Sequence, residues 1–182
     1  MFFARDDVSP WIARALAEVK VGFRSKLTAH RGKLLSDRDR GTPVHAATFL
    51  RRRQIVLDRE LKSDAGELRR ILVHELAHFV WWRLGNRQRL SYELLLTREL
   101  DLGLPGELGW SAEWRKLALK PRDRERRTRR WREYCCESFC DTAAWLYSGT
   151  GHHPEFTLPA RYRKERRKGL EAIIEKKERS CL

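Results

Sequence analysis

Two histidines and a glutamate interrupt an apolar run between Leu68 and Leu84, and this segment constrains the chain more than any other. The run has the periodicity of a buried helix, and its centre reads His74-Glu75-Leu-Ala-His78. The two histidines, at i and i+4, project from one face of a helix, so two imidazole nitrogens can converge on one metal ion. A chain does not bury such polar groups unless a partner satisfies them.

Zinc is the metal that this pattern favours, because Zn²⁺ binds imidazole well. Glu75 lies about 100° round the helix from the histidines, which suits a base acting on water rather than a ligand. A chance occurrence of the motif is the alternative. In that case His74 and His78 would be partly exposed, and Glu75 would pair with an arginine such as Arg70.

Composition bounds the class of protein. The chain has 182 residues and is 41% hydrophobic, so it can form one domain, residues 1–182, with a real core. Its net charge of +14 favours an acidic partner such as nucleic acid, although a solvated basic surface explains the charge as well. No secretory signal or apolar run of roughly twenty residues is seen, which predicts a cytoplasmic protein without a membrane span. Three clustered cysteines do not resemble a disulfide framework.

The first half of the chain is expected to contain one helix, two short strands and the motif helix. Ser9-Pro10 opens a helix that reaches about Val19, and Gly22 interrupts or ends it. Residues 28–42 are polar and favour a loop. Strands are predicted at 44–50 and 53–57, with a turn between them. Ser63-Asp64 then caps the motif helix, which stops at Gly85-Asn86.

The second half is expected to be helical. Helices are predicted at 87–101, at 111–119 before Pro121, and at about 125–148 before Gly149. A very basic helix follows at about 160–179. The fold class is therefore α+β, mostly helical, with a small antiparallel sheet before the motif helix.

A catalytic zinc needs a third protein ligand. The strongest candidate lies in Glu137-Ser-Phe-Cys-Asp141, because two carboxylates at i and i+4 point from one helix face. One carboxylate can bind the ion, and the other can accept the second N–H of a zinc-bound histidine. Alternatives are an exposed carboxylate face paired with arginines, or a different third ligand. The competing ligands are Cys136, Cys140, His152 and His153.

The combination of H-E-x-x-H on one helix with E-x-x-x-D on a later one resembles the gluzincin metallopeptidases of the thermolysin clan. The resemblance covers roughly residues 44–148 and implies a minimal zincin-like fold. It implies that His74, His78 and Glu137 bind zinc and that Glu75 is the general base. It also implies that Asp141 supports one histidine from behind, and that the edge strand of the sheet holds an extended substrate.

A second stretch is similar to the SprT-type metalloprotease domain. After H-E-L-A-H the chain has Gly109-Trp110-Ser111-Ala112-Glu113-Trp114, which looks like the G-W-x-x-E-W segment of those proteins. They use a third histidine before that segment and often act near DNA. This chain has no histidine between His78 and His152.

The function predicted from these residues is a zinc-dependent peptidase. Metal-activated water would attack a peptide carbonyl, and Glu75 would take its proton. An additional electrophile is expected among Tyr134, Tyr147, Tyr162, His152 and His153. The alternative is a basic protein that acts mainly by binding DNA or RNA. Its arginines would be those between 122 and 132 and the basic residues of 161–168, with Trp131 and Tyr162 among them.

Overall fold

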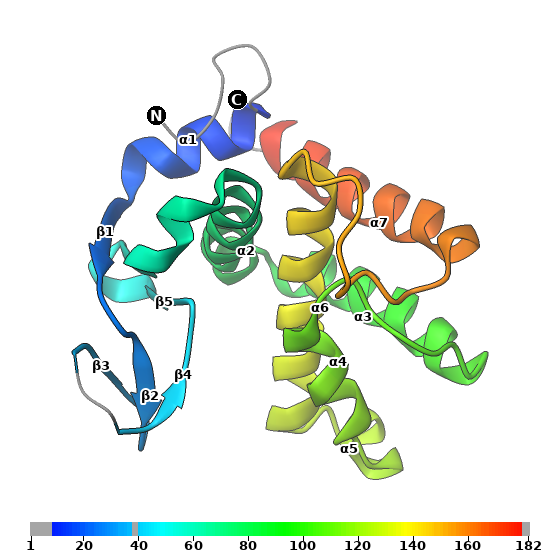
Figure 1. Ribbon diagram of the computed structural model, residues 1–182. Helices are drawn as coiled ribbons and strands as arrows, with labels where there is room; N and C mark the ends of the chain where they lie inside the picture. Colours follow the sequence, from blue (N-terminus) through cyan, green and yellow to red (C-terminus); the bar gives the residue numbers. More distant parts are fainter. Residues whose placement is uncertain (1–8, 38–39, 180–182) are drawn as a thin grey trace.

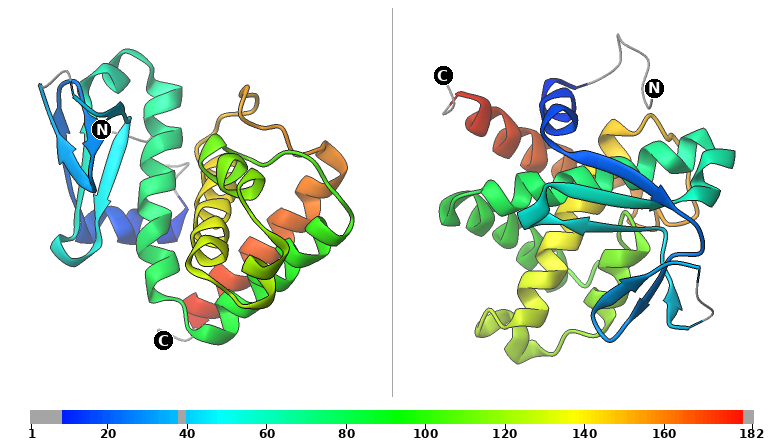
Figure 2. Two further views of the ribbon diagram at one scale, coloured as in Figure 1. Left: turned by 90° about the horizontal axis from the view of Figure 1, so that it is seen from below. Right: turned by 90° about the vertical axis from the view of Figure 1, so that its left-hand side faces the viewer.

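The computed structural model describes residues 9–37 and 40–179, and within this part of the chain the protein is mixed α+β and mostly helical. Figure 1 and the left view of Figure 2 show a small sheet on one side, α2 beside it, and the remaining long helices beyond α2. The predicted mostly helical α+β class is confirmed at this level. None of the described helices is long and apolar enough to cross a membrane.

The N-terminal segment forms α1 (Pro10–Glu18) and β1 (Lys20–Arg24). Pro10 stands at the first helical turn, as the sequence predicts. The role predicted for Gly22 is wrong, because the helix ends at Glu18 and Gly22 lies inside β1. The partner of this strand is β6, some thirty residues later, so no local sequence pattern predicts β1.

The sheet next to α2 has the order β1-β6-β5, where β5 is Ala46–Phe49 and β6 is Gln54–Asp58. β5 and β6 are antiparallel, as expected, and a short 3₁₀ turn, Leu50–Arg52, joins them. The sheet as a whole is mixed, because β1 runs parallel to β6. The prediction of an antiparallel sheet is therefore wrong for β1. A long excursion over residues 25–53 returns the chain in its original direction, as a parallel pair requires.

The first part of that excursion, which the sequence predicts as a loop over residues 28–42, contains the strands of a second sheet. This sheet has the order β3-β2-β4, and all its pairs are antiparallel. Its strands are β2 (Thr28–His30), β3 (Lys33–Leu35) and β4 (Thr42–Pro43). Arg31 and Gly32 both have positive φ, 47° and 74°, which suits the tight turn between β2 and β3.

The motif helix is α2 (Ala65–Arg83), and it follows the 3₁₀ segment Arg59–Ser63. The side chain of Asp64 accepts hydrogen bonds from the N–H groups of Gly66 and Glu67, so the predicted cap is confirmed. The helix α3 (Asn86–Asp101) follows directly. It agrees with the predicted helix over 87–101.

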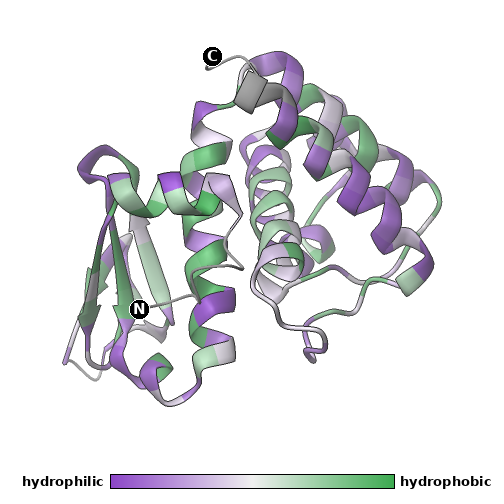
Figure 3. Ribbon diagram, turned by 90° about the horizontal axis from the view of Figure 1, so that it is seen from above, coloured by the Kyte–Doolittle hydropathy of each residue, from purple (hydrophilic) through white to green (hydrophobic). Residues whose placement is uncertain are grey.

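Four helices complete the chain: α4 (Trp110–Leu117), α5 (Pro121–Glu125), α6 (Arg129–Tyr147) and α7 (Ala160–Arg179). Gly109, not Ser111, caps α4. Pro121 opens the short helix α5, and Arg127 then takes a left-handed φ of 44°, so α6 starts at Arg129 instead of about 125. The predicted basic C-terminal helix over about 160–179 is confirmed as α7. Most of it is coloured hydrophilic in Figure 3.

The main core lies where α2 crosses α6. Side chains from α1, β6, α3 and α7 pack around the same contact. Trp131, Tyr134 and Phe139 from α6 are fully buried, as are Leu72 and Leu76 from α2. This packing fixes the facing surfaces of α2 and α6, which carry the motif residues.

Candidate metal centre

The two motif histidines lie on the side of α2 that faces α6. His74 is 7% exposed and Glu75 9% exposed, so both are buried within a polar environment. The His74 and His78 rings are neighbours, with centroids 5.0 Å apart. The partial exposure expected for a chance occurrence of the motif is therefore not found at His74, whereas the side chain of His78 is 18% exposed.

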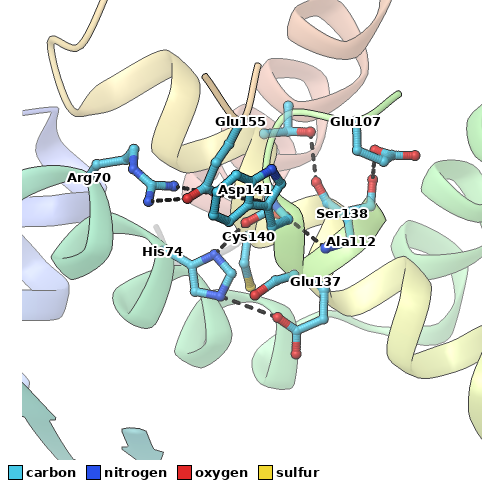
Figure 4. Close-up of polar contacts among 12 residues, drawn as sticks. Arg70, His74, Glu107, Ala112, Glu137, Ser138, Cys140, Asp141 and Glu155 are labelled. Carbon is cyan, nitrogen blue, oxygen red and sulfur yellow. Dashed lines mark hydrogen bonds and ion pairs between the residues drawn. The ribbon is translucent and has the colours of Figure 1, made fainter. Parts of the chain in front are cut away.

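Glu137 of α6 reaches the same point as both imidazoles. Its Oε2 lies 3.3 Å from Nε2 of His74 and 4.0 Å from Nε2 of His78. Ligand atoms around a tetrahedral zinc with about 2.05 Å bonds are about 3.3 Å apart. These two separations therefore fit a metal ligand set with small adjustments, and Figure 4 shows Glu137 directed at His74.

The Nδ1 atoms of both histidines contact side chains of α6. Nδ1 of His74 lies 2.7 Å from Oδ1 of Asp141. Nδ1 of His78 lies 3.4 Å from the sulfur atoms of both Cys136 and Cys140. Partners on Nδ1 fix the ring orientation and leave Nε2 to the ligand, which is how second-sphere groups act in metal sites.

Asp141 is itself held by α4. Its Oδ2 accepts a hydrogen bond of 2.9 Å from the backbone N–H of Ala112, while Oδ1 faces His74. The approach is close: a Cβ atom on Gly109 would lie 2.3–2.5 Å from the carboxylate atoms of Asp141. Glycine at 109 is therefore required for α4 to reach Asp141.

The electrostatics of the cluster match its geometry. Burial by itself would raise the pKa of Glu137, but its hydrogen bond with His74 and the nearby positive charges lower the pKa to about 2. Burial opposes charge on the histidines, yet Asp141 and Glu137 raise the pKa of His74 well above its usual value. For His78, burial is outweighed by Cys136 and Glu137, and its pKa rises to about 9. Without a metal, the histidines therefore hold protons that a cation would displace.

Cys140 is the rival third ligand. Ligand atoms of His74, His78 and Cys140 all lie within 4.8 Å of one another, so these three residues form a group able to hold a metal, a separation that the set with Glu137 does not meet. Two observations favour Glu137 instead. The sulfur of Cys140 contacts Nδ1 of His78, on the side of the ring away from Glu137. Burial raises the pKa of the Cys140 thiol well above its usual value, which opposes the thiolate that binds metal.

The side chain of Glu75 contacts the sheet. Its Oε2 accepts a hydrogen bond of 2.6 Å from the hydroxyl of Thr48 in β5. Arg70 does not pair with Glu75. It is held by Glu67 and Glu155, with N–O distances of 2.6 Å and 2.9 Å, and it is only 3% exposed. Glu75 thus contacts β5, and its role as a general base stays a prediction.

These side chains line one cavity of about 660 Å³. His74, Glu75, His78 and Glu137 line it, and so does Thr48 of β5. β5 is an edge strand of its sheet, and the wall on that side runs from Pro43 to Leu50. A substrate can therefore reach both Glu75 and the candidate ligand set from the same space.

The other residues singled out from the sequence lie elsewhere. His153 pairs with Glu67 at 3.3 Å, and Tyr134 donates a hydrogen bond to buried Glu107. None of the five expected electrophiles, Tyr134, Tyr147, Tyr162, His152 and His153, lines the cavity. The basic residues that do line it are His45, Arg70 and Arg115. The sequence analysis did not place His45 or Arg115 at the site, because they come from the segment before β5 and from α4.

Fewer residues of the basic helices are available to nucleic acid than the sequence suggests. Trp131 is 1% exposed and packs in the core, so it cannot stack on a base. Arg166 is fully buried between Glu99 and Glu107. Arg124, Arg127 and Arg129 also pair with carboxylates. Other exposed basic residues are Arg122, Arg126, Arg130, Arg132, Arg161, Lys164 and Arg167.

Comparison with protein-family models, with curated proteins and with solved structures gave no match for this chain.

Proposed function

We propose that this protein is a zinc-dependent hydrolase that cleaves peptide bonds. One observation carries the proposal: the carboxylate of Glu137 from α6 approaches the Nε2 atoms of two α2 histidines, within a cavity that a second carboxylate, Glu75, also lines. Three protein ligands with space beside them are typical of catalytic rather than structural zinc sites. The gluzincin resemblance of the sequence agrees with this arrangement.

When bound, zinc would supply Lewis-acid polarisation of a carbonyl and activation of water. The residues of the chain would supply the rest. Glu75 would accept a proton from the attacking water and later return it to the leaving amine. Thr48 donates to Oε2 of Glu75 and so holds the carboxylate on the β5 side of the cavity. His45 and Arg115, which also line the cavity, are the candidates for stabilising negative charge on the substrate.

The proposal is tested by zinc loading followed by assay on an unfolded protein such as reduced, alkylated casein. The wild-type protein should bind one zinc per chain and cleave casein, and Glu75→Gln should bind zinc equally but lose turnover by about 10³-fold. A zinc-loaded Glu75→Gln protein that cleaves as fast as the wild type would refute this mechanism.

A second candidate is nucleic-acid binding through the exposed basic residues of α5, α6 and α7. The net charge of +14 and the outward-facing arginines favour it. Such binding should weaken steeply as salt rises, because it releases counterions from phosphates. Absence of DNA binding at low salt would remove this candidate without affecting the hydrolase.

A further inference from the structure

The helix α4 exposes a row of large apolar side chains. Trp110, Trp114 and Leu117 are 48%, 68% and 79% exposed. They stand at i, i+4 and i+7, so they share one face of the helix. The two indole rings are nearly parallel, with centroids 6.3 Å apart and an interplanar angle of 10°. Together these three residues form what we term the tryptophan face.

This face cannot turn inward, because the opposite side of α4 is already fixed. The backbone N–H of buried Ala112 binds Asp141, and that of Trp110 binds Glu155 at 3.0 Å. Further along, Nζ of Lys116 donates to the carbonyl of Gly106. The contacts that hold α4 against α6 therefore also hold the tryptophans outward, in one orientation.

The tryptophan face belongs to the same cavity as the candidate metal centre. Trp110 and Trp114 line it together with His74, Glu75 and Glu137. Across the cavity stand Pro43, Val44 and Leu50, next to β5. Figure 1 and the left view of Figure 2 place β5 and α4 on opposite sides of α2, so a chain lying in the cavity passes between them.

Charge argues against a phosphate-bearing ligand at this place. Four carboxylates line the cavity, from Glu75, Glu137, Asp141 and Glu155. Of the basic residues there, Arg70 is held by Glu67 and Glu155, and Arg115 lies 3.5 Å from Glu137. The carboxylates thus offset the basic groups that line the cavity, so the aromatic surface offers a phosphate no excess of positive charge, whereas it accepts an uncharged apolar group.

We infer that the tryptophan face is a specificity surface that binds a large apolar or aromatic side chain of a peptide substrate, next to the bond to be cleaved. The inference rests on the proposed peptidase function. Flat indole rings offer a rigid, broad contact that stacks well on aromatic side chains. Covering them with such a side chain removes apolar area from water on both partners.

The experiment measures peptide binding without turnover, using zinc-loaded Glu75→Gln protein of full length. Two soluble peptides of equal length, differing only in a central Phe or Ala, are titrated by calorimetry. The Phe peptide should bind about tenfold more tightly, or about 1.4 kcal/mol. In the Trp110→Ala and Trp114→Ala backgrounds this preference should vanish.

Trp82→Ala is the matched control, because Trp82 is 54% exposed and does not line the cavity. It should leave the preference intact, and circular dichroism should show that all variants keep the fold. Three outcomes would overturn the inference. They are equal binding of the two peptides, a Phe preference that survives both substitutions, and tighter binding of oligo-dT than of the Phe peptide at the same face. Casein cleavage by the wild type separates the specificity inference from the peptidase proposal. Cleavage without a Phe preference would refute only the specificity surface. A Phe preference without cleavage would refute the peptidase function and leave the tryptophan face as a peptide-binding surface only.

Discussion

Oδ1 of Asp141 lies 2.7 Å from Nδ1 of His74, while the other oxygen of the same carboxylate accepts the backbone N–H of Ala112. One side chain thus joins the motif helix α2, the helix α6 and the start of α4. Figure 4 shows this carboxylate between the imidazole and the backbone nitrogen. The orientation of His74 therefore depends on where α4 begins.

Replacing Asp141 with Asn should weaken zinc binding by about 10- to 100-fold, because the imidazole loses its charged partner. The measurement is competition with a zinc-binding dye. Glu155→Gln is the control, since Glu155 also accepts an N–H of α4, from Trp110, but contacts neither histidine. Equal loss of affinity in both variants would mean that Asp141 acts only by holding α4.

The third ligand is tested by comparing Glu137→Ala with Cys140→Ser. If Glu137 completes the site, its removal should lower zinc affinity by roughly 100-fold or more, whereas Cys140→Ser should change it by less than about threefold. Metal content after dialysis against a weak chelator measures both. The reverse order of effects would transfer the ligand role to the thiol.

Gly109→Ala should destabilise the protein by about 1–3 kcal/mol, because the new Cβ would overlap the Asp141 carboxylate at 2.3–2.5 Å. Chemical denaturation of the metal-free protein measures the free energy of unfolding. Gly151→Ala is the matched control, since a Cβ there meets nothing within 4 Å. A small effect at both positions would show that α4 can move away from Asp141 freely.

Stability of the metal-free protein should fall as pH rises from 7 to 8.5. The pKa of His74 is raised above its usual 6.5, chiefly by Asp141 against burial, so its stabilising contribution is complete below about pH 6.5 and is lost above it. The Cys136 and His78 pair adds no slope. Their folded pKa values of about 6 and about 9 leave one bound proton on the pair in this window, as in the unfolded chain.

The expected slope is therefore roughly −1 kcal/mol per pH unit, from the one extra proton that His74 retains in the folded state. Urea denaturation with chelator present, repeated across the range, measures it. His74→Gln should flatten the profile. A rising profile in the wild type would contradict the assigned protonation of His74.

Arg166→Met should cost about 3–5 kcal/mol, because it leaves the buried carboxylates of Glu99 and Glu107 without their cation. Arg167→Met is the control. Arg167 is an exposed neighbour whose contact with the Trp145 ring, 5.5 Å away, contributes at most about 1 kcal/mol. Comparable losses at the two positions would mean that the buried cluster is not a specific anchor of α7.

Local patterns predict much of this molecule. The Asp64 cap, the period of α2 and the pair of strands at 46–49 and 54–58 depend on neighbours in sequence, and all are found. Glu137 and Asp141 both face α2, as expected from their i, i+4 spacing on a helix that has an apolar side. Spacing alone can place such residues because an α-helix has a fixed geometry.

What the sequence does not predict depends on distant partners. β1 exists because Lys20–Arg24 pairs with a strand thirty residues later. Arg166 reads as part of a solvated basic face, yet it is buried because Glu99 and Glu107 come from two other segments. Thr48 and the N–H of Ala112 join the site only once β5 and α4 are packed. The periodicity of a sequence cannot reveal contacts between such distant segments.

The candidate ligands come from two helices, α2 and α6, that are far apart along the chain. An ion bound between His74, His78 and Glu137 would act as a cross-link that closes the long intervening segment, much as a disulfide does. The cation would then resist separation of the two halves of the molecule as well as serve its chemistry. Hydrogen exchange along the α2–α6 contact should therefore quicken first when the ion is stripped away.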